Sequence, residues 1–141
     1  MMTGMAVAMV DMGIVSVAIE AAALSKQIAG VAQKYPDNSV IQSVFSMEAI
    51  KSGTVKMQKP EVKPEDIKSG VLVDQAIDSI NNALQILDGK ATPGEIQQYK
   101  EFVYSCGEAV ANAAGSGMFG SGTKVTEGEK VALEKFKTAI A

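Results

Sequence analysis

Two apolar repeats in the middle of the chain constrain its fold more than any other feature. The first advances by alternate steps of four and three residues through Val73, Ile77, Ile80, Leu84 and Leu87. The second advances by alternate steps of three and four through Ile96, Tyr99, Val103, Cys106 and Val110. Such steps keep side chains on one face of a helix. Because a link of only a few residues, beginning Asp88-Gly89, separates the repeats, they predict a central antiparallel helical hairpin in an all-α fold.

Capping sequences indicate where the predicted helices begin. Thr92 and Glu95 have the spacing of a capping box, and Thr126 and Glu129 repeat it before the last helix. Asp37 or Asn38 is expected to cap the helix that follows a Pro-containing turn. These boundaries predict a single domain of about five helices over residues 1–141. The expected helices cover residues 3–35, 39–52, 65–88, a segment from residue 93, and the C-terminal segment.

Two stretches separate these helices without a helical pattern of their own. Residues 54–64, TVKMQKPEVKP, form a connector rich in Lys and Pro. Residues 115–125 form a glycine loop that includes the sequence GSGMFGSG. A dinucleotide or P-loop motif requires a strand before its glycines, whereas this loop follows a predicted helix, and Thr123-Lys124 reverses the P-loop order. We therefore interpret the loop as a hinge and expect no nucleotide there.

The composition excludes several classes of site. The chain has 141 residues, no His, one Cys and a net charge of −3, and its basic residues are all Lys. Without His it has neither the commonest general base nor the commonest nitrogen ligand for metals. A single Cys forms no disulfide within the chain, which is typical of the cytoplasm. We therefore expect no enzyme, no cofactor, no metal and no nucleic-acid partner.

The N-terminal segment is apolar on almost every side. Met2, Met5, Met9 and Met12 share one helix face, while Asp11 and Glu20 interrupt a stretch too short to span a membrane. A helix of this kind lies at the centre of a bundle or is shared between chains. The Met face is thus a buried core face, an interaction face, or, least in favour, a Cu(I) site.

Four other residues that could take part in chemistry have simple structural interpretations. Cys106 lies within the second repeat, where no His is present to activate it, so it is expected to be a buried filler. Asp74 and Asp78 are four residues apart on the first repeat and are expected on its solvated face. Asp11 is expected to have a Lys partner or to lie at an exposed edge.

The turns and caps resemble a known group of proteins. The motifs YPDNSVIQSV, TPGEIQQYKEFV and GSGMFGSGTKVTEGEKVALEKFKTAIA are similar to those of a family of small uncharacterised all-helical bacterial and archaeal proteins. The resemblance implies an Ala- and Val-rich first helix, a Pro-Asp-Asn turn, and a glycine loop before a short last helix. It implies no activity and no functional residue.

These features together predict a non-enzymatic interaction or assembly protein. Its apolar N-terminal helix is expected to mediate self-association into a homo-oligomer, and a different protein partner is also compatible with the sequence. An alternative is a carrier or sensor that holds an apolar small molecule between its helices. A continuous apolar cavity would favour the carrier, whereas a flat exposed apolar face would favour assembly.

Overall fold

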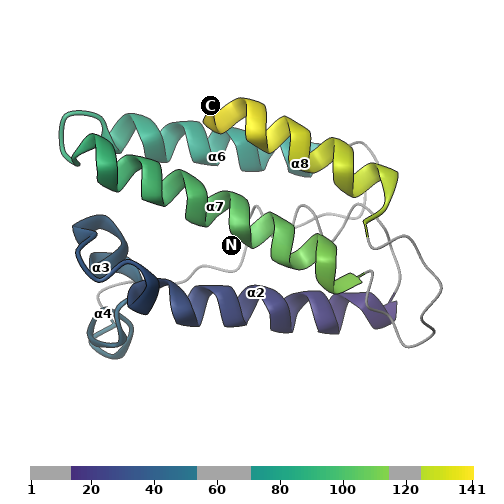
Figure 1. Ribbon diagram of the computed structural model, residues 1–141, viewed down its shortest axis with the longest axis horizontal. Coiled ribbons are helices and arrows are strands. Elements are labelled where there is room, and N and C mark those ends of the chain that lie inside the picture. Colours follow the sequence, from purple (N-terminus) through teal and green to yellow (C-terminus); the bar gives the residue numbers. More distant parts are fainter. Residues whose placement is uncertain (1–13, 54–70, 115–124) are drawn as a thin grey trace.

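The structure is a computed structural model, and it describes residues 14–53, 71–114 and 125–141. All regular secondary structure in these three stretches is helical (Figure 1). The fold is therefore all-α, as the sequence predicts. Its helices are α2 (Ile14–Lys34), α3 (Ser39–Phe45), α4 (Met47–Lys51), α6 (Val71–Leu87), α7 (Pro93–Ala114) and α8 (Glu127–Ile140).

Helix α7 is the central element of the arrangement. It lies between α2 on one side and the pair formed by α6 and α8 on the other (Figure 1). Its most extensive contact is with α2, and it also packs on α3 and α8, while α6 packs on α8. The apolar N-terminal helix is therefore an edge element among the described helices, and α7 occupies the centre.

Helices α6 and α7 run in opposite directions on either side of a short turn, as the predicted hairpin requires (Figure 1), but α6 packs mainly on α8. Gly89 at this turn has a φ of +69°, a value that glycine adopts without steric cost. The amide of Ala91 donates to the Leu87 carbonyl oxygen at 2.9 Å and closes the end of α6. The positive φ at this turn therefore explains why the turn contains glycine.

The core joins residues of α2, α3, α6, α7 and α8. Phe136 on α8 and Ile41 on α3 have no exposed surface, and the Phe45 and Phe102 rings meet edge to face with centroids 5.1 Å apart. Both apolar repeats contribute, since Val73, Ile80, Val103, Cys106 and Val110 are buried and Ile77, Leu84 and Tyr99 pack against them. The two apolar repeats thus supply much of the core, as the sequence predicts.

The predicted helix over residues 39–52 is interrupted. Ser46 adopts an extended backbone conformation, ends α3, and accepts a hydrogen bond from the Ala49 amide to cap α4. A Ser side chain satisfies an amide at a helix start, so it stabilises a new helix start here. Met47 follows this break directly, and 65% of its surface is exposed. Gly53 follows α4 in the left-handed conformation, with a φ of +67°.

The connector at 54–64 and residues 115–124 of the glycine loop lie outside the described residues, so their predicted roles stay predictions. Val125, which ends the predicted loop, packs against the core.

The fully buried Phe136 provides a test of the core. We expect Phe136→Ala to lower the free energy of unfolding by about 3–5 kcal/mol, because it removes a buried ring and leaves a cavity. Val131→Ala on the same helix is the control, since the Val131 side chain is largely exposed and its loss should change stability by about 0.5 kcal/mol or less. Urea denaturation followed by circular dichroism measures both. Equal midpoints for the two variants would show that α8 does not complete the core.

Candidate functional site

The residues predicted to form the interaction face all precede the first described residue. Met2, Met5, Met9 and Met12, together with Asp11, fall within residues 1–13, outside the described part of the chain. The structure therefore shows the apolar N-terminal segment only from Ile14 onward, as α2. The helices that pack against α2, and the side of α2 that they leave uncovered, therefore bear on the predicted interaction face.

One narrow stripe attaches α2 to the bundle. Leu24, Val31 and Tyr35 are buried, and Ile28 packs against the same core. These positions advance by four, three and four residues, so they lie along a single side of the helix. The extensive contacts of α2 with other described helices are to α7 and α3. The side of α2 that faces away from α7 is left without a neighbour among those helices.

Small residues occupy much of this outer side of α2. Ala22, Ala29 and Gly30 are exposed, and a Cβ atom placed on Gly30 would meet nothing within 4 Å. Lys26, Gln33 and Lys34 are exposed among them. Ser25 lies on the flank of this side, and its hydroxyl donates to the Ala21 carbonyl oxygen at 2.8 Å. The small residues at positions 22, 29 and 30 allow the backbone of another helix to approach closely.

A buried asparagine joins the start of α3 to the start of α7. Asn38 is 1% exposed, and its Oδ1 accepts a hydrogen bond from the Ile41 amide at 3.0 Å, which caps α3. Its Nδ2 donates to the Glu95 carbonyl oxygen at 3.0 Å and to Gln98 Oε1 at 2.9 Å. Both polar atoms of the amide therefore have hydrogen-bond partners, and the nitrogen donates twice, so neither atom is buried unsatisfied.

Glu95 adds a second bridge between the same two helices. Its Oε2 accepts from the Thr92 amide at 2.9 Å, and Thr92 Oγ1 accepts from the Glu95 amide at 3.2 Å, which completes the predicted capping box of α7. Its Oε1 accepts from the Ser39 amide at 2.8 Å and from the Ser39 hydroxyl. We call the set Asn38, Ser39, Thr92, Glu95 and Gln98 the polar clip.

The hydrogen bonds of the clip favour the charged form of the Glu95 carboxyl group. The Ser39 hydroxyl is the largest cause, followed by the Thr92 amide, and together with the remaining donors they lower the pKa of Glu95 from 4.5 to about 2. The carboxylate is therefore ionised at any pH at which the clip is intact. Because it accepts from two helix starts, it stabilises both with one side chain.

The end of α2 is held to the same region by side chains next to the clip. Gln42 Nε2 on α3 donates to the Ala32 carbonyl oxygen at 2.6 Å and to the Tyr35 carbonyl oxygen at 3.0 Å. These carbonyls lie at the C-terminal end of α2, where backbone acceptors lack partners within the helix. The Tyr35 hydroxyl also donates to Glu101 Oε2 on α7 at 3.5 Å. Polar contacts thus fix α2, α3 and α7 to one another at this end.

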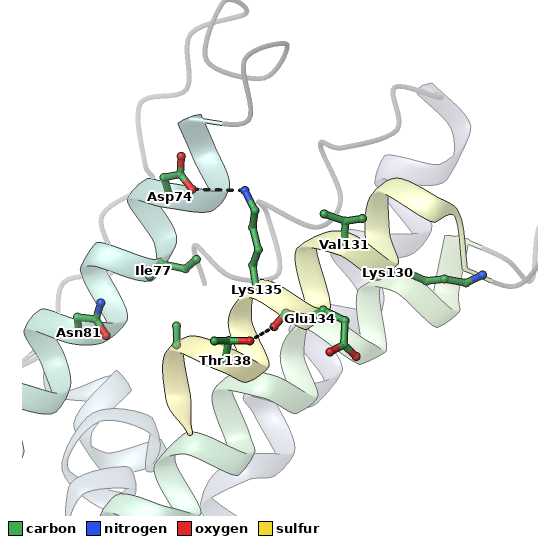
Figure 2. A pocket seen from close by; sticks show the side chains of 9 residues that line it. Asp74, Ile77, Asn81, Lys130, Val131, Glu134, Lys135 and Thr138 are labelled. Atoms are coloured by element: carbon green, nitrogen blue, oxygen red, sulfur yellow. Dashed lines mark hydrogen bonds and ion pairs between the residues drawn. The ribbon is translucent and has the colours of Figure 1, made fainter.

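A groove lies on the opposite side of the molecule, between α6 and α8. Its volume is about 740 Å³, and it is open to solvent. Figure 2 shows its walls, which include Asp74, Ile77 and Asn81 from α6 and Val131, Lys135 and Thr138 from α8. Asp74 Oδ1 and Lys135 Nζ are 3.7 Å apart and connect the two helices, and both side chains are more than half exposed. Such a pair contributes about 0–1 kcal/mol, so it is a weak bridge across the groove.

The remaining predicted residues have the environments expected of them. Cys106 is buried on α7, and burial raises the pKa of its thiol to about 11. Asp74 and Asp78 are both exposed on α6. Within residues 14–53, 71–114 and 125–141, no group of three or more Cys, Asp or Glu side chains is placed to hold a metal ion.

The contacts of the polar clip that join α3 to α7 were not predicted from the sequence. The capping box of Thr92 and Glu95 is visible as a local pattern, but the Ser39 partner of Glu95 is 56 residues distant. The burial of Glu129 was also not anticipated: it is 1% exposed while its Oε2 accepts from the Thr126 amide at 2.8 Å. Its capping box with Thr126 is formed as predicted.

Among the described residues, no helix is both long enough and apolar enough to cross a membrane. No protein-family model, curated protein or solved structure matches the chain. The resemblance to small helical bacterial and archaeal proteins therefore stays a prediction.

The lowered pKa of Glu95 predicts a specific acid sensitivity. Because the folded-state pKa lies below the ordinary value of 4.5, this group's contribution to stability is present above pH 4.5 and is lost as the pH falls toward about 2. Glu95→Gln replaces the carboxylate with an amide. The amide nitrogen then faces the hydrogen-bond donors of Ser39 and Thr92, and no group at this position titrates. We expect wild type to lose more stability than Glu95→Gln between pH 5 and about 2.5. Thermal melts over this range measure the difference, and parallel curves for the two proteins would contradict it.

The burial of the Cys106 thiol predicts that it reacts slowly with thiol reagents in the native protein. With a pKa of about 11, Cys106 is almost entirely protonated at neutral pH, and thiol reagents attack through the thiolate. We expect an aromatic disulfide reagent to label the unfolded chain in urea rapidly and the native chain only at the rate at which it opens. Absorbance of the released thiolate measures both rates. Equally rapid labelling of native protein would show that the Cys106 site is open.

Proposed function

We propose that the chain is a cytoplasmic, non-enzymatic assembly protein that forms a homo-oligomer through its N-terminal helix. The contact surface comprises the outer side of α2, with Ala22, Ala29 and Gly30, and the sequence-predicted face of Met2, Met5, Met9 and Met12. The observation that carries the proposal is the edge position of α2. This helix, which continues the apolar N-terminal segment from Ile14 onward, has described helices on one side only.

The edge position bears on the two explanations for a helix that is apolar on every side. Such a helix lies at the centre of its own bundle or is shared with another chain. Helix α7 occupies the central place among the described helices, and α2 lies to one side of it (Figure 1). This arrangement supports the shared position for α2. A two-fold dimer is the simplest form, because the same surface then serves both copies.

Exposed apolar side chains near the end of α2 support the same interpretation. Helix α4 has five residues, and its contacts with other described helices are to α3. Met47 is 65% exposed and Ile50 is 44% exposed on this helix. Adaptable Met side chains are frequent at protein interaction surfaces, so α4 extends the apolar surface available to a second chain.

The carrier alternative receives no specific support from the groove between α6 and α8. A site for an apolar small molecule encloses most of the ligand surface. This groove is open, and its lining includes the charged side chains of Asp74, Lys130, Glu134 and Lys135. It also lies on α6 and α8, away from α2. Assembly is therefore the function that the described geometry favours.

Sedimentation equilibrium tests the proposal with variants of the outer side of α2. We expect wild type at tens of micromolar to sediment as a dimer or larger species. Ala22→Arg with Ala29→Arg should dissociate it to monomers, because two bulky cations prevent close approach of a second helix. Both positions are exposed, so the far-ultraviolet circular dichroism should remain that of wild type.

A matched control adds the same charges elsewhere. Gln75→Arg with Asn82→Arg places two Arg residues on exposed positions of α6 and should leave the association unchanged. Met5→Lys with Met9→Lys tests the N-terminal face separately and should also dissociate the assembly. A wild-type monomer at these concentrations would refute the proposal, as would an α2 variant and an N-terminal variant that both associate like wild type.

A further inference from the structure

We draw no further inference here: the strongest candidate, the open groove between α6 and α8, has two carboxylates and two lysines whose charges cancel in its lining, and nothing in the structure shows what covers it.

Discussion

The buried amide of Asn38 is the interaction on which the arrangement of the helices depends. A buried polar side chain is costly unless its hydrogen-bonding groups have partners, and α7 supplies two of the partners here, the Glu95 carbonyl oxygen and Gln98 Oε1. Its contacts join residues 57 and 60 positions apart in the sequence. Glu95 repeats the connection through Ser39, and Gln42 secures the end of α2 next to it. Apolar burial gives the bundle its stability, while the polar clip specifies which end of α7 meets the turn after α2.

The clip and Gln42 together place α2 at the edge. The clip holds the start of α3 on the start of α7, and Gln42 on α3 binds the end of α2, so α2 runs along one side of α7 while α6 and α8 occupy the other (Figure 1). The stripe of Leu24, Ile28 and Val31 is then covered, and the opposite side of α2 faces away from the described core. The proposed assembly is based on this placement, because the second copy would pack on the side of α2 that no described helix covers.

Local features of the sequence predicted much of this fold, because helix periodicity and helix capping depend on residues that are close together in the chain. The repeats through Val73 and Val103 identified the core faces, and the Thr126 capping box identified the start of α8. Contacts between distant residues have no such pattern. Nothing near Ser39 indicates that it donates to Glu95, and nothing near Ser46 decides between continuing a helix and capping a new one. The edge position of α2 was not predictable either, since apolar composition does not specify what covers a helix. The Met face itself lies in residues 1–13, outside the described part of the chain.

A double-mutant cycle between Asn38 and Gln98 tests the role of the clip most directly. Asn38→Ala, Gln98→Ala and the double variant would be compared with wild type by urea denaturation, which gives the free energy of unfolding of each. Because Asn38 Nδ2 donates to Gln98 Oε1 at 2.9 Å in a partly buried site, the two substitutions should be strongly non-additive, with a coupling energy of about 1 kcal/mol or more. Additive effects, with a coupling energy below about 0.3 kcal/mol, would contradict the claim that this contact fixes α3 on α7.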